Sequence, residues 1–265
     1  MYLELYGLKS SPFNITSDPQ FFFESLSHKE ALAALIYGIQ ERKGIILITG
    51  EVGTGKTTLC KALLKKLPPD VKTSLILNPY FSEVQLLRAI VQDFGLEIKK
   101  RSRLDMVERL NSFLVNISLS GENAVLIIDE AQNLANRQLE QIRLLSNLET
   151  AKDKLLQIVL VGQPELKEKL SKFNLRQIKQ RVFVKQDIFP LREEEVKKYV
   201  EYRLQQAGTT EINILPESYK VIYEFSKGIP RLVNMICDRA LLLGFVKESK
   251  TFDQEMFKAC AEELL

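Results

Sequence analysis

The eight residues from Gly50 to Thr57 carry the clearest chemical signal in the sequence. They read Gly-Glu-Val-Gly-Thr-Gly-Lys-Thr, directly after the apolar run Ile45–Ile48, and match the strand–loop–helix pattern G-x-x-x-x-G-K-[ST]. The glycines of this pattern let main-chain N–H groups point at an anion, and the helix that begins near Lys56 adds the positive end of its dipole. Lys56 would reach the β- and γ-phosphates of a nucleotide, and the Thr57 hydroxyl would bind Mg²⁺. A glycine-rich turn that matches by chance is the alternative. The candidate nucleotide-binding residues are Gly50, Glu51, Val52, Gly53, Thr54, Gly55, Lys56, Thr57 and Thr58.

A second signal is the short apolar run Ala124–Ile128, which is followed by the carboxylates Asp129 and Glu130. Such a run is typical of a strand that is buried on both faces of a parallel sheet. At its carboxyl end, Asp129 would hold Mg²⁺ directly or through water, and Glu130 would orient and deprotonate an attacking water. The alternative is that the two acids only cap the next helix.

The elements that must position these residues alternate between strand and helix. Strand-like runs occur at 45–49, 74–77, 124–128, 157–161 and 182–187, and helical patterns occur at 31–42, 57–66, 83–94, 104–117 and 137–150. This alternation predicts a parallel sheet covered on both faces. After Pro190 the chain shows only helix-period segments, at 193–206, 216–225, 231–246 and 252–263. We therefore expect a nucleotide-binding core at 1–190, including an N-terminal segment 1–43, and a small helical lid at 191–265.

Three further positions could carry chemistry in that layout. Gln163 follows the fourth strand and could touch the γ-phosphate or the attacking water, or it could only satisfy main-chain groups before Pro164. Arg181 stands directly before the fifth strand, from which it could reach a neighbouring subunit's nucleotide and stabilise the transferring phosphoryl group. The basic cluster that contains Arg176 is expected at the end of a helix, where cations commonly only complement the dipole on a solvated face; for Arg176 a functional role is the alternative. Arg231 falls in the first turn of a lid helix, where the dipole repels it, and such a misfit is a hint of function.

The composition is that of an ordinary globular protein. The chain has 265 residues, of which 45% are hydrophobic and 27% charged, so it is not disordered. A net charge of +3 is too balanced to demand a nucleic-acid partner. The three cysteines lack metal-ligand spacing and are expected to be reduced core thiols of a cytoplasmic protein. We find no signal peptide or membrane span, so any link to the inner membrane would need a partner or a segment absent from this chain.

Together these residues resemble an AAA+ ATPase, and more narrowly the bacterial general secretion pathway protein A family. The motifs that carry the resemblance are Tyr2–Leu8 with Pro12-Phe13, Asp18-Pro19, Ser27–Leu32, Gly50–Thr58, Ile128–Gln132, Val161–Leu166 and Gly228–Asn234. The resemblance implies a Walker A motif at 50–57, a Walker B motif at 125–130, sensor 1 at Gln163, an arginine finger at Arg181 and sensor 2 at Arg231. It also implies a sheet of order 5-1-4-3-2, ATP as substrate with Mg²⁺, and assembly of the chain into a homo-oligomeric ring. Members of the family usually continue into a membrane-spanning segment and a periplasmic region, and we do not expect either within these 265 residues.

Two function classes remain open from the sequence, and a third is a more distant possibility. The first is an ATPase motor or switch that helps a secretion, pilus or envelope export machine to assemble. The second is a DNA-associated AAA+ ATPase, for which the basic run Lys99–Arg103 could contact phosphates, although such a run is usually only a solvated face. The third is a nucleotide-binding scaffold without turnover, and the presence of Glu130 argues against it.

Overall fold

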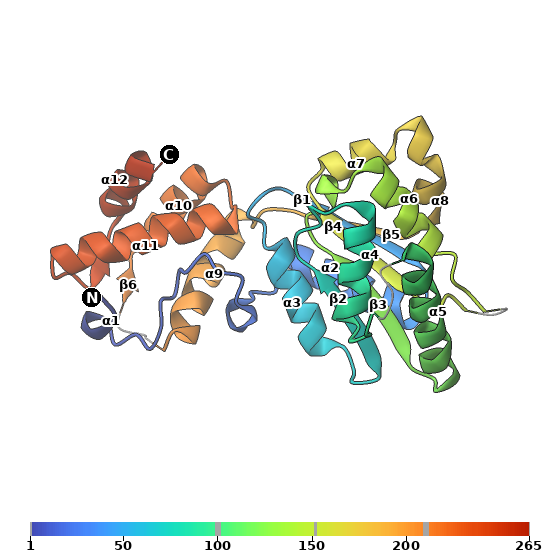
Figure 1. The fold of residues 1–265 in the computed structure, drawn as a ribbon. Helices are drawn as coiled ribbons and strands as arrows, with labels where there is room; N and C mark the ends of the chain where they lie inside the picture. Colours follow the sequence, from blue (N-terminus) through green and yellow to red (C-terminus); the bar gives the residue numbers. More distant parts are fainter. Residues whose placement is uncertain (1, 99–101, 151–152, 209–211, 265) are drawn as a thin grey trace. The chain divides into compact units, whose positions relative to one another are not determined.

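The protein consists of two compact units (Figure 1). The computed structural model describes residues 2–98, 102–150, 153–208 and 212–264. The helical unit comprises Met1–His28, Val52–Thr58 and Phe189–Leu265, and the sheet unit comprises Lys29–Glu51 and Leu59–Ile188.

The sheet unit is built on five parallel strands. They are β1 (Ile45–Gly50), β2 (Val71–Ile76), β3 (Asn123–Ile128), β4 (Gln157–Gly162) and β5 (Val182–Ile188). The strand order is β2-β3-β4-β1-β5, so the order expected from the family resemblance is confirmed. β4 pairs with both β1 and β3, which places the strand that precedes Gln163 between the two strands that precede the nucleotide motifs.

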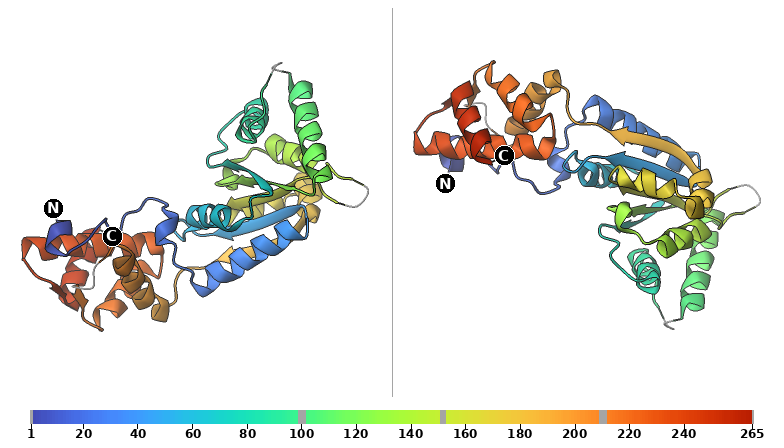
Figure 2. Two further views of the ribbon diagram at one scale, coloured as in Figure 1. Left: turned by 90° about the horizontal axis from the view of Figure 1, so that it is seen from below. Right: turned by 90° about the horizontal axis from the view of Figure 1, so that it is seen from above.

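Helices cover both faces of this sheet (Figure 2). Ile45 and Leu47 of β1 join the large apolar cluster formed with the helices that follow β2, β3 and β4, whereas Ile46 lies against Gly38 on the other face. This alternation is the strand period of two. The helices are α2 (Leu26–Gln40), α3 (Lys56–Lys66), α4 (Glu83–Asp93), α5 (Arg103–Leu119), η2 (Ala131–Asn133), α6 (Asn136–Leu145), α7 (Glu165–Leu170), η3 (Phe173–Leu175) and α8 (Arg176–Arg181). The first residues of α2 and α3 belong to the helical unit.

One predicted helix ends early. The pattern predicted a helix over 137–150, but α6 ends at Leu145. The hydroxyl of Ser146 donates to the carbonyl of Arg143 at 2.7 Å, and Glu149 pairs with Lys154 in an antiparallel bridge. A serine hydroxyl competes for helical carbonyls in this way, which favours termination.

The helical unit packs its helices around a second apolar cluster. They are α1 (Tyr2–Leu5), η1 (Pro19–Phe21), α9 (Glu193–Gln206), α10 (Ser218–Ser226), α11 (Pro230–Val246) and α12 (Gln254–Leu264). The expectation of helices alone after residue 190 was wrong, because β6 (Asn213–Ile214) and β7 (Thr251–Phe252) form a short parallel pair. Two-residue strands leave no periodicity to detect in a sequence.

The N-terminal segment is fastened to α9 of the same unit by a buried arginine. Arg203 donates to the carbonyls of Pro12 at 2.5 Å and Asn14 at 3.0 Å, and its guanidinium lies 4.8 Å from the ring centroid of Phe21. A buried guanidinium needs such partners to offset its desolvation.

The predicted division of the chain at residue 190 into a functional core and a lid stays a prediction, since compact packing does not decide which segments act together.

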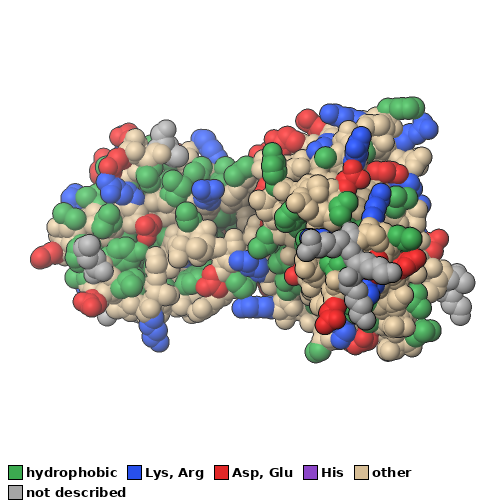
Figure 3. All heavy atoms as spheres, in the orientation of Figure 1, with side chains coloured by type: hydrophobic (Ala, Val, Ile, Leu, Met, Phe, Trp, Pro, Cys, Tyr) green, Lys and Arg blue, Asp and Glu red, His purple; other side chains and the backbone are tan. Residues whose placement is uncertain are grey.

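Charged side chains of both signs are interspersed on the face of each unit that Figure 3 shows. Within the described ranges, none of the helices combines the length and the apolar character that crossing a membrane requires.

Candidate nucleotide site

The glycine-rich loop runs from the end of β1 to the start of α3. β1 is buried along its whole length, and α3 begins at Lys56, so the helix start predicted near this lysine is confirmed. Gly53 and Gly55 have φ angles of 81° and 93°. Positive φ at these positions turns the main chain sharply, as an anion-binding concavity of N–H groups requires.

The first turn of α11 contacts this loop within the helical unit. The main-chain N–H of Arg231 donates to the carbonyl oxygen of Gly53 at 3.2 Å. A Cβ atom added to Gly53 would lie 2.8 Å from Cβ of Arg231 and 3.0 Å from Cγ2 of Ile229, so a side chain does not fit there. The structure therefore brings Arg231 next to the predicted phosphate loop, although this contact is made by its main chain.

His28, the only histidine of the chain, holds the same loop from the N-terminal segment. Its Nε2 lies 3.0 Å from the carbonyl oxygen of Thr54, and its Nδ1 lies 2.7 Å from Oγ of Ser25. Because a carbonyl only accepts, Nε2 carries the proton and Nδ1 of the neutral ring accepts from Ser25. Burial lowers the pKa of His28, against smaller opposing effects from Thr54, Glu195 and Glu24. Our reading of the sequence did not assign this contact, although the motif Ser27–Leu32 contains the residue.

The two carboxylates stand at the carboxyl end of β3, in the sheet unit. Asp129 is 1% exposed, and its Oδ1 accepts the main-chain N–H of Glu130 at 2.9 Å. Glu130 adopts the left-handed conformation, with φ 51° and ψ 36°. A residue other than glycine or asparagine is uncommon there, and such strain concentrates at functional sites.

The structure brings Glu130 and Gln163 together. Gln163 follows the end of β4, and its Nε2 lies 3.4 Å from Oε2 of Glu130. A second amide, that of Gln132, donates to the same carboxylate oxygen at 2.5 Å. Sequence reasoning missed Gln132, and the signal that could have found it is its position two residues after the acid within the Ile128–Gln132 motif.

A buried hydroxyl and an acid lie at the ends of β1 and β5. Thr49 donates to Oδ1 of Asp187 at 2.5 Å, and Lys167 of α7 forms an ion pair with the same carboxylate. Burial opposes ionisation of Asp187, but the hydrogen bonds from Lys167 and Thr49 outweigh it and hold the pKa of Asp187 below its ordinary value. These contacts tie the end of β1, where the loop begins, to α7.

Arg181 and Arg176 occupy opposite ends of α8. Arg181 is its last residue, as the sequence predicted, and its charge adds to the larger effect of Lys154 in lowering the pKa of Glu149. Arg176 opens the helix and lies 4.5 Å from the ring centroid of Phe173, so the expectation that it complements the dipole at a helix carboxyl end was wrong. Among the described residues, the hydrogen bond between Gln163 and Glu130 does not involve Arg181, which makes no ion pair with Glu130.

The expected magnesium ligands are oxygen atoms on two secondary-structure ends, Thr57 in the first turn of α3 and Asp129 after β3. No group of three or more His, Cys, Asp or Glu side chains that could hold a metal occurs in the described part of the chain. Magnesium bound with a nucleotide needs only one or two protein oxygens, because phosphates and water complete its shell. A hydroxyl and a carboxylate oxygen are therefore donor types that Mg²⁺ arriving with ATP would use.

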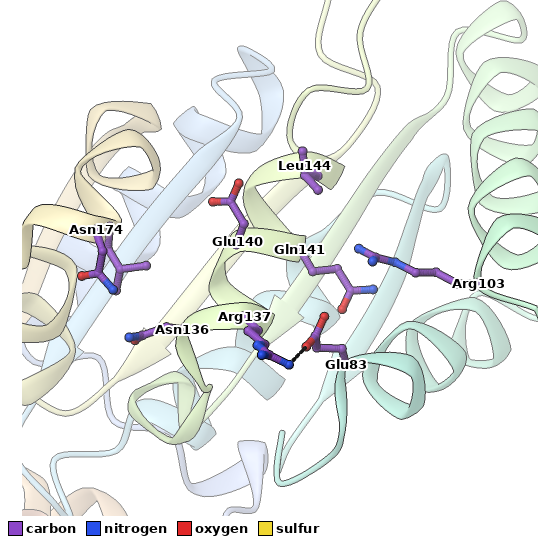
Figure 4. A pocket seen from close by; sticks show the side chains of 9 residues that line it. Glu83, Arg103, Asn136, Arg137, Glu140, Gln141, Leu144 and Asn174 are labelled. Carbon is purple, nitrogen blue, oxygen red and sulfur yellow. Dashed lines mark ion pairs between the residues drawn. The ribbon is translucent and has the colours of Figure 1, made fainter.

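A hollow of about 380 Å³ lies elsewhere in the sheet unit (Figure 4). It is lined by the first residues of α4 and α5, by one face of α6, and by Asn174 and Leu175. None of the predicted nucleotide-binding residues lines it, but Arg103, the last residue of the basic run, does. The side-chain amide of Gln141 finds no hydrogen-bond partner within the described residues. Since Gln141 is only 3% exposed, its amide is not available to a ligand in this hollow.

The comparisons with known proteins agree with this architecture. The AAA domain family matches residues 39–170. General secretion pathway protein A of Aeromonas hydrophila is 44% identical over 251 residues, which are 94% of this chain and 46% of that protein. The chain thus spans about half the length of this relative.

Solved structures with the same fold include proteins of low identity. The Aeropyrum pernix ORC2 protein aligns with a TM-score of 0.69 at 17% identity, over 88% of this chain and 66% of its own. CDC6P of Pyrobaculum aerophilum aligns with a TM-score of 0.71 at 18% identity, over 93% of this chain and 70% of its own. The Thermotoga maritima RuvB Holliday junction branch migration motor aligns with a TM-score of 0.61 at 18% identity, over 92% of this chain and 70% of its own. These likenesses concern the fold alone. From its motifs, its strand order and its sequence identity, this chain belongs to the AAA+ P-loop proteins and is a relative of general secretion pathway protein A.

Proposed function

We propose that this chain binds ATP together with Mg²⁺ and hydrolyses it to ADP and phosphate. One observation carries the proposal. The glycine-rich loop leaves the sheet at the end of β1, and Asp129 and Glu130 leave it at the end of β3. All pairings of this sheet are parallel, so these two ends lie along the same edge, where ligands of open α/β sheets bind.

Each residue has a role in the proposed reaction. Lys56 and the main-chain N–H groups of the loop would hold the triphosphate, with Thr57 and Asp129 as the magnesium ligands. The metal would neutralise charge on the β- and γ-phosphates. Glu130 would take a proton from the attacking water, and Gln163 would contact that water or the γ-phosphate.

Two arginines would connect hydrolysis to assembly and movement. Arg181, which is partly exposed at the end of α8, would reach the nucleotide of a neighbouring copy in a ring. A single subunit would then lack a complete site, and turnover per subunit would rise with protein concentration. Arg231, whose main chain already contacts Gly53, would report loss of the γ-phosphate to the helices after residue 190.

The work done with ATP is proposed from the relative. Because 94% of this chain aligns with general secretion pathway protein A, we favour a ring-forming motor or switch that assists assembly of a secretion, pilus or envelope export machine. On this view the chain acts in the cytoplasm and is recruited to the inner membrane by a partner or by a segment outside these 265 residues.

The alternative is a DNA-associated ATPase, which the fold likeness to the ORC2 and RuvB proteins keeps open. Lys99, Lys100 and Arg101 of the basic run lie outside the described residues, while Ser102 caps α5 and Arg103 opens it. A gel-shift titration over salt separates the two classes. DNA binding that weakens steeply with salt supports the alternative, and no shift at low salt supports the first class.

Phosphate release by wild-type protein, Lys56→Ala and Lys65→Ala tests the proposed activity. Both variants remove one ammonium group from α3, but Lys65 lies exposed in its last turn. We expect release by the wild type and by Lys65→Ala, and none by Lys56→Ala. Equal release by all three would contradict the proposal, as would no release by the wild type at any protein concentration.

A further inference from the structure

The amide of Gln132 joins the proposed general base to the end of β4. Its Nε2 donates to Oε2 of Glu130 at 2.5 Å, and its Oε1 accepts the main-chain N–H of Gln163 at 3.1 Å. A primary amide has donors at one end and an acceptor at the other, so one side chain can make both contacts at once.

These two partners also fix the orientation of the amide. An ionised carboxylate only accepts, and a main-chain N–H only donates. Turning the Gln132 amide over would set its oxygen against Glu130 and its N–H₂ against the N–H of Gln163. The network therefore selects one orientation of the side chain.

The surrounding chain is shaped to admit this amide. A Cβ atom added to Gly162 would lie 2.7 Å from Oε1 of Gln132, so a side chain at the end of β4 would push the amide away. From α7, Nζ of Lys169 donates to the carbonyl of Gln132 at 3.0 Å and to that of Leu134, and holds the η2 turn in place.

The main chain at Glu130 needs such support. Glu130 lies in the left-handed conformation, which costs a residue with a side chain about 1 to 2 kcal/mol. Such a conformation persists only where the surrounding contacts hold it in place. Both amide contacts to the carboxylate, from Gln132 and Gln163, are made on Oε2. Oε1 is then the oxygen that we assign to the attacking water.

We propose that Gln132 is a positioning residue, which aims the Glu130 carboxylate at the attacking water and makes that aim depend on the position of the β4 end that carries Gln163. This inference rests on the proposed function, in which Glu130 is the general base. A shift of the β4 end on contact with the γ-phosphate would move the Gln163 N–H, and through Gln132 the carboxylate.

The test compares two buried or half-buried glutamines of the sheet unit. Gln132→Met keeps the length of the side chain and removes both hydrogen bonds. Gln138→Met is the matched control, because Gln138 also uses its amide at both ends, accepting from the Ala135 N–H at 2.7 Å and donating to the Phe81 carbonyl at 2.9 Å. ATP binding, kcat and thermal unfolding are measured for each variant.

We expect Gln132→Met to lower kcat by about 10- to 100-fold, as misplacement of a catalytic group does, with the ATP dissociation constant unchanged. We expect Gln138→Met to lower the unfolding temperature without changing kcat. In the Glu130→Gln background the effect of Gln132→Met should disappear, since both changes act on one group. A wild-type kcat in folded Gln132→Met would overturn the inference.

A second variant and the wild-type control keep the test decisive. If Gln132→Met does not fold, Gln132→Glu retains an acceptor for the Gln163 N–H while placing a second carboxylate beside Glu130, and we expect a folded protein with the same loss of kcat. Hydrolysis that is lost in Glu130→Gln but unchanged in Gln132→Glu would overturn the inference and leave the proposed function standing. Absence of hydrolysis in the wild type would contradict the proposed function itself.

Discussion

The phosphate loop and the acidic end of β3 are held in place by different kinds of contact. In the helical unit, the carbonyl oxygens of Gly53 and Thr54 accept from the Arg231 N–H and from the His28 imidazole. In the sheet unit, the Glu130 carboxylate accepts from the side-chain amides of Gln132 and Gln163. These contacts of the loop are thus made by its main chain, and those of the acid by its side chain.

This difference predicts how each region responds to substitution. A main-chain carbonyl remains after almost any replacement, so the loop is vulnerable where a replacement changes the backbone conformation or removes the imidazole. A contact to a side-chain carboxylate, by contrast, is lost when a substitution removes the oxygen that makes it. We therefore expect loop variants to change ATP binding, and variants at the acidic end to change turnover.

Glu130→Gln is expected to give the largest difference between the effect on hydrolysis and the effect on ATP binding. This change keeps the shape of the side chain and removes its basicity, and general bases commonly contribute about 10²- to 10⁴-fold to a rate. We expect ATP binding to be retained and hydrolysis to fall by that factor, measured by calorimetry and phosphate release. Hydrolysis at the parent rate would show that Glu130 is not the base.

Gly53→Ala tests the loop, with Gly95→Ala as its control. The two glycines have φ angles of 81° and 77°, so both changes place alanine in a left-handed conformation. Only at Gly53 does the new Cβ meet neighbours, among them Cβ of Arg231 at 2.8 Å, whereas nothing lies within 4 Å at Gly95. We expect Gly53→Ala to weaken ATP binding by about tenfold, or about 1.4 kcal/mol, and Gly95→Ala to leave it unchanged. Equal affinities for both would mean that the Arg231 contact does not shape the loop.

His28→Gln should change how stability depends on pH. Burial holds the folded-state pKa of His28 below its ordinary value of 6.5, so the unfolded chain takes up a proton first as pH falls. The resulting loss of unfolding free energy begins near pH 6.5, continues down to the folded-state pKa, and has a slope of up to about 1.4 kcal/mol per pH unit. Urea denaturation at pH 7 and pH 5 should show a smaller difference for His28→Gln than for the wild type. The same difference in both proteins would contradict a buried neutral imidazole.

The smallest effect is expected at Gln141, which belongs to neither region. Its buried amide has no hydrogen-bond partner among the described residues, and replacing such a group by an apolar one of similar size is neutral or stabilising. We expect Gln141→Leu to raise the free energy of unfolding by about 1 kcal/mol, with ATP binding and turnover unchanged. A loss of either activity would mean that the hollow beside α6 takes part in function.

The sequence predicted the parts of this architecture that depend on local patterns. The strand before Gly50, the helix start at Lys56 and the strand before Asp129 each follow from a contiguous run of residues. The strand order came from the family resemblance, since parallel strands leave no local sign of their neighbours. The roles of Arg181, Gln163 and Arg231 stay predictions, although Gln163 does lie beside Glu130.

What the sequence did not predict depends on contacts between distant segments. His28 reaches Thr54 across 26 positions of the chain, and Gln132 reaches the Gln163 N–H across 31. Each is a polar side chain in a turn or a helix start, where its type alone is compatible with many partners. The two-residue strands β6 and β7 were also missed, because they pair across distant segments of the chain.

The central claim is that the loop binds the triphosphate of ATP with Mg²⁺ independently of the acid that drives hydrolysis. Calorimetric titration of ATP into Glu130→Gln, with and without Mg²⁺ and beside Lys56→Ala, tests it most directly. The account predicts saturable, magnesium-dependent binding to Glu130→Gln and none to Lys56→Ala. No magnesium-dependent binding to Glu130→Gln at millimolar ATP, or equal binding to both variants, would contradict it.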